Sequence, residues 1–581
     1  MSIKLKINGR EVIGQEGQTI LQVAQANNID IPTLCYLNLH EIGLVCNHGS
    51  CRVCVVEVAG RRNLCPACVT PITEGMDIQT NSPRARLARK TNMDLLLSNH
   101  PQDCLVCEKS GNCALQELAT KLQMKKIDYA GPISQPNHVE ESIAIQRNPA
   151  KCILCGHCVD MCSKVQTVGA LGSINRGFDT KMGPALDKTL DETACVNCGQ
   201  CVTVCPTGAL TQRNQTDVVR NVLRDPNKYV VIQTAPATRV ALGDEFGYEV
   251  GTNVTGKMVA ALKELGFKKV FDTNFAADLT ILEETAEFLD RFTKKENLPL
   301  ITSCCPGWIK FIEHQYPELL NHPSSCKSPQ NMEGALIKTY FAEKAGIDPK
   351  DIFVVSLMPC IAKKYESQRE ELAVNGLQDV DLSISVRELA TLIKEEGINF
   401  RELADAEFDS PLGDGTGAAD IFANTGGVLE AVVRHAAKEL TGEETSVEYK
   451  ALRGESGIQT AEVTLNGITL KVAVASGLGN ARKLLEEIKA GTCEYHAIEV
   501  MACPGGCVAG GGQPIHIDMP RAEVIAKRHA GIYAIDAGKP TRISSQNPDV
   551  KRVYDEFLGK PNSHKAHELL HTHFVKKRKV R

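Results

Sequence analysis

The sequence lacks the features that mark membrane, secreted and nucleic-acid-binding proteins. No run in the 581 residues approaches the ~18 consecutive apolar residues that a membrane-spanning helix needs. The opening stretch, MSIKLKINGREV, has no apolar segment typical of a signal peptide, and this favours a cytoplasmic protein. The formal net charge is −5, so the chain as a whole does not have the basic character of a nucleic-acid-binding protein.

Complete nucleotide-binding and metalloprotease motifs are missing as well. GTNVTGKM (251–258) is one residue short of a phosphate-binding P-loop, and Met258 replaces the hydroxyl that would bind Mg²⁺. SGLGNAR (476–482) has Arg482 in place of the third glycine of the dinucleotide motif, so we interpret it as a strand-to-helix turn. HELLH (567–571) matches a zinc-protease pattern without an apparent third ligand. We interpret HELLH as part of a helical tail packed on the surface. Adventitious metal binding is the alternative.

Cysteine, in contrast, is abundant, with 24 residues that cluster at short gaps. In a chain without secretion signals, this spacing is typical of metal binding in a reducing compartment rather than of disulfides. At about 100–200 residues per domain, the length indicates roughly three to five domains.

Two copies of one cysteine pattern, C-x2-C-x2-C-x3-C, form an internal repeat at 152–162 and 195–205. This spacing is typical of two-cluster ferredoxins, in which the fourth cysteine of each loop binds the other [4Fe–4S] cluster. Paired zinc knuckles are the alternative, but the fourth cysteine in both copies disfavours them. The predicted ligand sets are Cys152, Cys155, Cys158 and Cys205 for one cluster, and Cys195, Cys198, Cys201 and Cys162 for the other.

A third site is predicted at His100, Cys104, Cys107 and Cys113. A structural zinc ion with three thiolates and one imidazole fits this pattern about as well as a [4Fe–4S] cluster does. The two neighbouring clusters favour the iron–sulfur interpretation. Replacing a thiolate by a neutral imidazole removes one negative charge, so the reduction potential should rise.

The segment 35–68 contains six cysteines, of which a [2Fe–2S] cluster needs four. Cys51 and Cys54 form a tight pair, and Cys68 follows a hairpin expected at Ala59-Gly60. The fourth ligand is Cys35 or Cys46, and the spacing leaves both open.

Hydrophobic periodicity predicts an N-terminal region rich in strands, a helical region with one interruption, and a long α/β region. The expected strands are 3–7, before the turn signal Asn8-Gly9, and 229–235 and 351–360. The expected helices are 19–26, 84–122 with an interruption at 99–113, and 258–266. The basic run KKRKVR (576–581) favours a solvated end.

Three further stretches, TSCCPGW (302–308), MPCIAKKYE (358–366) and EVMACPGGCVAGGGQP (499–514), resemble the three signatures of the iron-only, or [FeFe], hydrogenases. The resemblance extends through the upstream clusters and covers nearly the whole chain. The sequence resembles the catalytic subunit of cytosolic, NAD(P)-linked multisubunit hydrogenases of anaerobic metabolism, including electron-bifurcating ones. It implies reversible oxidation of H₂ to protons and electrons.

The resemblance implies an H-cluster, a [4Fe–4S] cube joined through a cysteine to a diiron unit that carries CO, cyanide and a dithiolate bridge. By motif match, the cube ligands are Cys305, Cys360, Cys503 and Cys507, with Cys507 also bridging to the diiron unit. The same resemblance assigns the [2Fe–2S] cluster to Cys35, Cys51, Cys54 and Cys68, which leaves Cys46 and Cys65 unused. Three accessory [4Fe–4S] clusters complete the expected set. Cys326 and Cys493 have no assigned partner.

Cys304 and Cys305 are adjacent, so their side chains point in different directions and a disulfide between them would be strained. The resemblance implies that Cys304 is not a ligand and passes protons. Heterolytic cleavage of H₂ gives a hydride and a proton, so a proton acceptor must lie nearby. A free thiol suits that task better than a metal-bound thiolate does.

The resemblance continues the proton relay through Glu284, Ser324 and Glu287. The two glutamates are three residues apart, so a helix would place them on one face. Without the resemblance, a solvated acidic face would be the favoured interpretation of this pair. Desolvation should raise the pKa of a relay carboxyl and let it exchange protons at neutral pH.

Other positions match the wall of the family's active site. Lys363 corresponds to a lysine that pairs with a cyanide ligand. Ala237 stands where some relatives have a serine, so one hydrogen-bond donor is lost. The remaining pocket positions, which could also be ordinary core residues, are Ala235, Pro236, Gln330, Met358, Phe422 and Met501.

The expected fold class is multidomain, α+β and α/β. The domains are an N-terminal β-grasp [2Fe–2S] domain at 1–80, a His-ligated [4Fe–4S] domain at 81–140, a two-cluster ferredoxin domain at 141–220, an α/β H-cluster domain at 221–520 and a helical segment resembling a small subunit at 521–581.

The resemblance also implies partners: a flavin- and NAD(P)-binding subunit, a small [2Fe–2S] subunit, in some members ferredoxin, and maturases that supply the diiron unit. The alternative is a non-catalytic electron-transfer, assembly or H₂-sensing protein. Cys304 together with Lys363 argues against it, because neither residue is needed to hold a cube.

Overall fold

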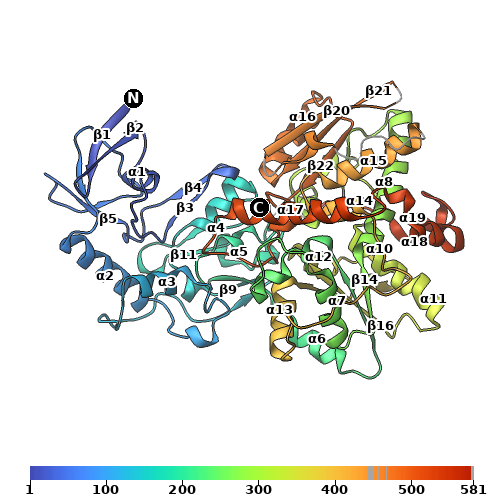
Figure 1. Cartoon of the computed structure of the whole chain (residues 1–581), viewed down its shortest axis with the longest axis horizontal. Coiled ribbons are helices and arrows are strands. Elements are labelled where there is room, and N and C mark those ends of the chain that lie inside the picture. The colour runs from blue at the N-terminus through green and yellow to red at the C-terminus, as the bar shows by residue number, and fades with distance from the viewer. Residues whose placement is uncertain (442–448, 455–456, 466, 578–581) are drawn as a thin grey trace.

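The computed structural model describes residues 1–441, 449–454, 457–465 and 467–577, and the last four residues of the basic run at 576–581 lie outside this part. Figure 1 shows the N-terminal domain at one end of the molecule, a large α/β body at the other, and the cysteine-rich loops between them. Within the described residues, no helix combines the length and the hydrophobicity needed to cross a lipid bilayer.

The N-terminal domain is a five-stranded sheet in the order β2-β1-β7-β5-β6. Leu5 and Ile7 point into its core while Lys4 and Lys6, which alternate with them, face solvent; this is the alternation that the sequence predicts for β1. The turn at Asn8-Gly9 has positive φ at both residues, as a tight hairpin requires. The elements are β1 (Ser2–Ile7), β2 (Arg10–Gln15), α1 (Ile20–Ala26), β5 (Val55–Val58), β6 (Cys65–Pro66) and β7 (Asp77–Gln79).

Two helices and the loop between them follow. Ser82 caps the first helix and Pro83 occupies its first position, so the start of this helix is fixed locally. The predicted interruption at 99–113 is confirmed as the loop that carries His100 and its neighbouring cysteines. The elements are β3 (Tyr36–Leu39), β4 (Leu44–Asn47), α2 (Pro83–Ser98) and α3 (Ala114–Lys121).

The cysteine repeat folds twice in the same way. Leu154 and Asn197, at matching positions, both have positive φ, and so do Gly156 and Gly199. Each loop then enters a short helix, and the outer strands β9 and β12 pair antiparallel. The elements are β8 (Glu140–Glu141), β9 (Ile145–Arg147), α4 (His157–Asp160), β10 (Gly172–Ile174), β11 (Lys181–Gly183), α5 (Gln200–Thr203) and β12 (Leu210–Gln212).

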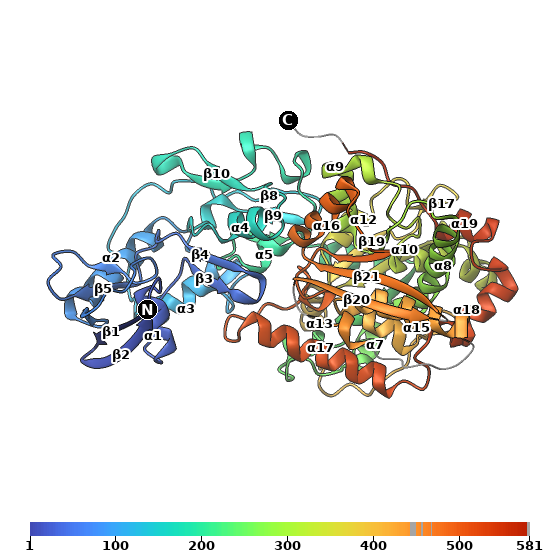
Figure 2. The same cartoon turned by 90° about the horizontal axis from the view of Figure 1, so that it is seen from above.

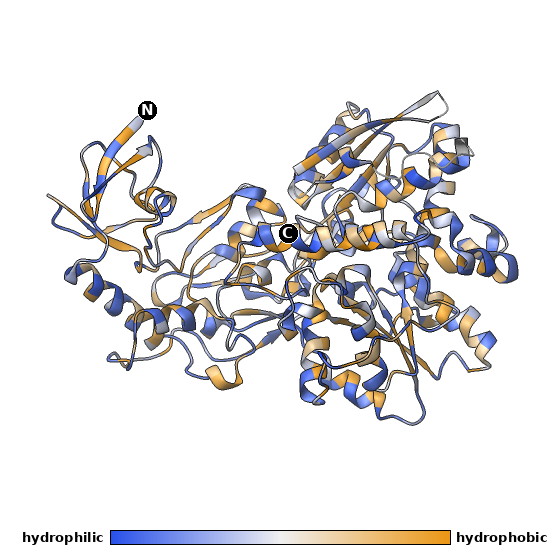
Figure 3. Cartoon of the chain, viewed as in Figure 1, coloured by the Kyte–Doolittle hydropathy of each residue, from blue (hydrophilic) through white to orange (hydrophobic). Residues whose placement is uncertain are grey.

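The α/β body contains two four-stranded sheets, in the orders β14-β13-β16-β19 and β15-β22-β21-β20. All strand pairs are parallel except β20 with β21. The central strands β13 and β16 are largely buried and mostly hydrophobic, as is typical of strands covered on both faces (Figure 3). The strands are β13 (Tyr229–Thr234), β14 (Lys269–Asp272), β15 (Leu300–Ile301), β16 (Ile352–Met358), β19 (Leu382–Ser385), β20 (Gly457–Leu465), β21 (Ile468–Ser476) and β22 (Ala497–Met501).

Helix α8 (Thr273–Lys294) follows β14 and packs against two other helices, α10 (Pro329–Leu336) and α15 (Gly427–Thr441). The other helices of the body are α6 (Thr216–Leu223), α7 (Thr255–Glu264), α9 (Pro306–Gln315), α11 (Ala342–Ala345), α12 (Ala362–Glu366), α13 (Val386–Glu395), α14 (Gly417–Asp420) and α16 (Leu478–Ala490).

The C-terminal segment wraps around the body, as the view in Figure 2 shows. Arg528, on the first helix of this segment, donates to the carbonyls of Val508 and Pro514 and pairs with Asp244. The last helix carries the HELLH stretch as predicted, but it is more than a surface cover, because Leu570 and His571 are buried. The helices are α17 (Arg521–Gly538), α18 (Pro548–Val553) and α19 (His564–Leu570).

Candidate active site

Four parallel strands direct their carboxyl ends toward one place. The residues just after β13, β15, β16 and β22 line a common cavity of about 80 Å³, on a measure by which one water needs about 10–15 Å³. Ligand sites of open α/β sheets lie at such strand ends. The topology therefore brings together three cysteine-containing stretches that are far apart in the sequence.

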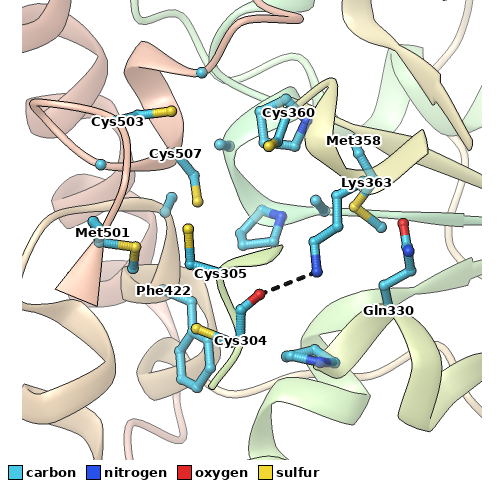
Figure 4. Close-up of a pocket in the computed structure, with 18 of the residues that line it drawn as sticks. Cys304, Cys305, Gln330, Met358, Cys360, Lys363, Phe422, Met501, Cys503 and Cys507 are labelled. Carbon is cyan, nitrogen blue, oxygen red and sulfur yellow. Dashed lines mark hydrogen bonds between the residues drawn. The ribbon is translucent and has the colours of Figure 1, made fainter. Parts of the chain in front are cut away.

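Four thiols surround this cavity (Figure 4). Cys305 lies at the start of α9, Cys360 follows β16, and Cys503 and Cys507 lie on the turn after β22. Burial raises the pKa of all four thiols, that of Cys360 to about 12. The backbone N–H of Ala502 donates to the sulfur of Cys305 at 3.4 Å. Four cysteine sulfurs around one cavity are the donor set of a [4Fe–4S] cluster, so these residues fit that group.

The turn that carries Cys503 and Cys507 is rich in glycine because it runs against other backbone. Gly506 has a φ of +78°, and a Cβ there would lie 2.7 Å from the backbone nitrogen of Thr425. A Cβ at Gly510 would overlap the carbonyl oxygen of Pro359, the residue before Cys360. Glycine thus lets the two cysteine-bearing loops approach closely.

Cys304 faces a different environment from its neighbour. Figure 4 shows its sulfur directed toward Phe422, while the sulfur of Cys305 is directed toward Cys507. Burial, with Glu284 as the next cause, raises the pKa of Cys304 well above its usual range. The side chain is therefore held as a neutral thiol.

Lys363 is held at the cavity by two acceptors. Its Nζ donates to the carbonyl of Cys304 at 3.2 Å and to the Glu366 carboxylate at 2.7 Å. Burial alone would lower the pKa of Lys363, but Glu366 more than offsets this effect, and the pKa is raised. Glu366 also accepts from Ser328 and Gln330, so it connects the lysine to α10. The sequence analysis missed Glu366, although it lies one turn after Lys363.

The structure brings the four predicted relay residues close to one another, and of these four Cys304 lines the cavity. Glu284 and Glu287 lie on α8, and burial followed by the charge of Glu287 raises the pKa of Glu284 to about 8. Ser324 donates to Glu287 at 2.8 Å. One carboxyl oxygen of Glu284, which is 2% exposed, has no hydrogen-bond partner among the described residues.

Arg291 extends this series toward the surface, and the sequence analysis did not identify it. Its guanidinium donates to Glu287 at 2.5 Å and to the carbonyls of Asn321, His322 and Pro323. The only sequence signal is its position four residues after Glu287 on the same helix. Because its side chain is 15% exposed, the series of polar groups ends close to solvent.

All remaining predicted pocket positions line the same cavity. They are Ala235, Pro236, Gln330, Met358, Phe422 and Met501. Ala237 lines it too, and its carbonyl accepts from the side chain of Gln513. Apart from the cysteines, the wall is therefore mainly apolar, with Thr273, Gln330 and Lys363 as its polar side chains.

Comparisons with known proteins agree with this geometry. Residues 228–511 match the family model described as "Iron only hydrogenase large subunit, C-terminal domain", and 522–577 match "Iron hydrogenase small subunit". An NADP-reducing hydrogenase subunit of Solidesulfovibrio fructosivorans is 51% identical, with all of both chains covered. Iron hydrogenase 1 of Clostridium pasteurianum is 40% identical over 98% of this chain and 99% of its own.

The chain belongs to the iron-only hydrogenases. A solved structure of an [FeFe]-hydrogenase from Chlamydomonas reinhardtii is 41% identical, with a TM-score of 0.57, and it covers 63% of this chain and 99% of its own. Three further models match the N-terminal part of the hydrogenase: a 2Fe-2S iron-sulfur cluster binding domain at 1–83, an NADH-ubiquinone oxidoreductase-G iron-sulfur binding region at 89–128 and a 4Fe-4S dicluster domain at 151–209.

In the N-terminal domain of this hydrogenase, the structure distinguishes Cys35 from Cys46. The backbone N–H of Cys51 lies 3.5 Å from the sulfur of Cys35, and the sulfurs of Cys54 and Cys68 are 3.4 Å apart. Cys46 is buried elsewhere; this burial, with Asp160 next to it, raises its pKa to about 12. Four cysteines therefore meet without Cys46, and this set fits a [2Fe–2S] cluster.

The two ferredoxin loops of the hydrogenase form two crossed sets of cysteines. One cavity is lined by Cys152, Cys155, Cys158 and Cys205. The other is lined by Cys162, Cys195, Cys198 and Cys201. Each cavity thus has three cysteines from one loop and one from the other, the arrangement that two [4Fe–4S] clusters require.

The loop between α2 and α3 carries His100, Cys104, Cys107 and Cys113. Burial lowers the pKa of His100 to about 4, so its imidazole is neutral, and its Nδ1 has no partner among the described residues. A neutral imidazole with a free nitrogen is suited to binding iron. Lys109, on the same loop, is buried, and this burial lowers its pKa.

Proposed function

We propose that this hydrogenase is the catalytic subunit of a multisubunit, NADP-linked enzyme that interconverts H₂ with protons and electrons. The full-length likeness to an NADP-reducing hydrogenase subunit carries this proposal. The site supports it, because Cys304 and Lys363 line the cavity without being needed to hold a cube. This feature favours a catalytic site over an assembly or sensing function.

The H-cluster, when bound, supplies the iron at which H₂ is split and its electrons are accepted. Cys305, Cys360, Cys503 and Cys507 would hold its cube. Lys363, kept charged by Glu366, would donate to a cyanide ligand. The apolar wall around Phe422 would exclude water.

The proton would move along residues of this chain. The Cys304 thiol would exchange a proton with Glu284, whose raised pKa of about 8 suits transfer near neutral pH. Ser324 links Glu284 to Glu287. Arg291 holds the outer carboxylate in place.

The N-terminal domains would carry electrons. We assign one [2Fe–2S] cluster to Cys35, Cys51, Cys54 and Cys68 in a β-grasp domain at 1–80. We assign three accessory [4Fe–4S] clusters to a His-ligated domain at 81–140 and a ferredoxin domain at 141–220. Residues 221–520 form the H-cluster domain, and 521–581 form the segment resembling a small subunit.

The NADP-linked reaction would require partner subunits in the cytoplasm. In the described residues neither weak nucleotide motif is free to bind phosphate. Lys257 donates to the carbonyls of Arg401 and Leu403, and Arg482 donates to Thr167. The proposed partners are a flavin- and NAD(P)-binding subunit and a small [2Fe–2S] subunit, with ferredoxin as a further electron carrier and maturases for the diiron unit.

The test compares Cys304→Ala with Cys493→Ala in maturase-supplied protein. Cys493 lies outside the cavity and serves as the matched control. We expect Cys304→Ala to keep its iron and its infrared CO and cyanide bands but to lose more than 90% of H₂ evolution from a reduced dye. Full turnover in this variant would contradict the proton assignment. Reduction of NADP by H₂ with the flavin-free chain alone would contradict the need for partners.

A further inference from the structure

A second group of potential metal ligands lies at the outer end of the relay. Glu287, Cys326 and His571 offer a carboxylate oxygen, a sulfur and an imidazole nitrogen that all lie within 4.8 Å of one another. They come from α8, from the loop before α10 and from the end of α19. An isolated backbone bridge between Cys326 and His571 fixes the C-terminal segment at this position.

We propose that Glu287, Cys326 and His571 form a binding site for a divalent cation of the zinc type, and that its occupation closes the proton route. Thiolate, imidazole and carboxylate are the three ligand types that Zn²⁺ prefers. With Zn–S of about 2.3 Å, Zn–O of about 2.0 Å and a tetrahedral angle, sulfur and oxygen would be about 3.5 Å apart. The sulfur of Cys326 and the carboxylate of Glu287 are 4.0 Å apart, so a small side-chain movement would bring them into register.

The groups around His571 resemble those that hydrogen-bond to a metal-binding histidine and orient its ring. One ring nitrogen lies 2.8 Å from the hydroxyl of Ser325, and the other lies 3.2 Å from the Glu283 carboxylate. Whichever nitrogen binds the cation, the other keeps a partner that orients the ring. Glu283 is fixed in turn by Tyr554 at 2.6 Å and by the backbone N–H of Asn562 at 2.8 Å.

Two features oppose binding of the cation: the contact of Arg291 with Glu287 and the proton on the Cys326 thiol. Neither prevents the side chain concerned from acting as a ligand. Arg291 occupies one oxygen of Glu287, but the other oxygen accepts only the Ser324 hydroxyl and the backbone N–H of Ser325 and faces Cys326. The Cys326 thiol must lose its proton, which the incoming cation would displace. The buried carboxylate of Glu283 adds negative charge on the other side.

Access to the site is provided by the HELLH stretch, which the proposed function does not otherwise use. The exposed ring of His567 stacks on the ring of His571 with centroids 4.0 Å apart. A cation captured by His567 would therefore reach the inner ligands without opening the core. Water would complete a site with three protein ligands.

The consequence for turnover rests on the proposed proton route. A cation on Glu287 would take the oxygen that accepts the Ser324 hydrogen bond, so Ser324 could no longer pass a proton outward. Zn²⁺ is therefore expected to inhibit the enzyme reversibly, without touching the iron clusters.

The binding experiment uses the full-length, cluster-loaded protein titrated with Zn²⁺ against a competing chelator. We expect one Zn²⁺ per chain, with one sulfur among its ligands by zinc-edge X-ray absorption. Cys326→Ala should lose the sulfur ligand, and Cys326→Ala and His571→Asn should each bind at least tenfold more weakly. Cys493→Ala is the control and should bind normally. Unchanged binding in Cys326→Ala, or zinc bound without sulfur in the parent protein, would overturn the site.

The activity experiment separates the site from the route. Micromolar Zn²⁺ should reduce H₂ evolution from a reduced dye at least fivefold in the parent protein and in Cys493→Ala, and the chelator should reverse this. Cys326→Ala should remain active in the presence of zinc. If zinc binds at the site without inhibiting H₂ evolution, zinc does not block proton transfer and Glu287 is not part of the proton route. The metal site itself would still be supported. If zinc inhibits Cys326→Ala as strongly as it inhibits the parent protein, the inhibition does not arise from zinc at this site.

Discussion

Two adjacent thiols, Cys304 and Cys305, differ because of what surrounds them rather than because of their chemistry. The sulfur of Cys305 accepts a backbone N–H and is directed toward the other cysteines of the cavity. The sulfur of Cys304 is directed toward Phe422, and burial, followed by Glu284, raises its pKa. A one-residue step along the chain thus separates a metal-binding position from a proton-carrying one.

The protonation of Glu284 can be observed directly. Burial raises the pKa of this carboxyl to about 8, so the folded protein should keep it protonated at neutral pH. We expect an infrared carboxyl band that is present at pH 6.5 and disappears as the pH rises through about 8. Glu284→Gln should lack this band at every pH and should lose most turnover. Loss of the band near pH 4.5 would show that the carboxyl is not desolvated.

Sequence alone identified the residues that carry motifs, and it missed those that act through long-range contacts. Glu366 holds Lys363 and joins it to Ser328 and Gln330, but nothing in the spacing indicates that α12 lies close to the start of α10. Arg291 likewise depends on three carbonyls that folding brings to it. The choice of Cys35 over Cys46 needed either a family resemblance or coordinates.

At the scale of elements, the site depends on turns that bring backbones together. The glycines after β22 pass close to the loop after β16 and to the backbone near Thr425. Because backbone lies on both sides, neither loop can move away at low cost.

Gly510→Ala tests this requirement. The added methyl group would overlap the Pro359 carbonyl and push apart the loops that carry Cys360 and Cys507. We expect a loss of about 1–3 kcal/mol in unfolding free energy, less iron in the H-cluster domain and at least tenfold lower turnover. Gly538→Ala, where a Cβ meets no atom within 4 Å, should leave iron and turnover unchanged. Full iron and turnover in Gly510→Ala would show that the loops need not be so close.

The elements themselves were largely predictable, because their signals are local. The alternation in β1, the Asn8-Gly9 turn and the hydrophobic runs of β13 and β16 all appear where the sequence places them. The HELLH helix was also expected, but the burial of His571 was not, because it depends on contacts with α8 that lie far away in the sequence.

At the scale of the whole molecule, the chain is arranged as a line from the N-terminal sheet to the α/β body, with the cysteine loops between (Figure 1). The proposed [2Fe–2S] cluster lies at the end away from the cavity. This position suits an electron entry or exit point for a partner subunit.

Cys35→Ala and Cys46→Ala test this end of the molecule as a matched pair, because both cysteines are buried in the same N-terminal region. Cys35→Ala should lose the two irons and the electron paramagnetic resonance signal of a [2Fe–2S] cluster, whereas Cys46→Ala should keep both. Dye-driven H₂ evolution should stay within about twofold of the parent in each, because a dye can reach the other clusters. Loss of the signal in Cys46→Ala alone would reverse the ligand choice.

The crossed cavities of the two ferredoxin loops have a consequence for biogenesis. Because each cavity is completed by a cysteine from the opposite loop, neither loop can adopt its final shape alone. Filling one cavity with iron and sulfide would pre-order the partner loop for the second, so delivery of the two cubes should be cooperative. Chains carrying a single cube should then be scarce during maturation under iron limitation, with empty and fully supplied chains predominating.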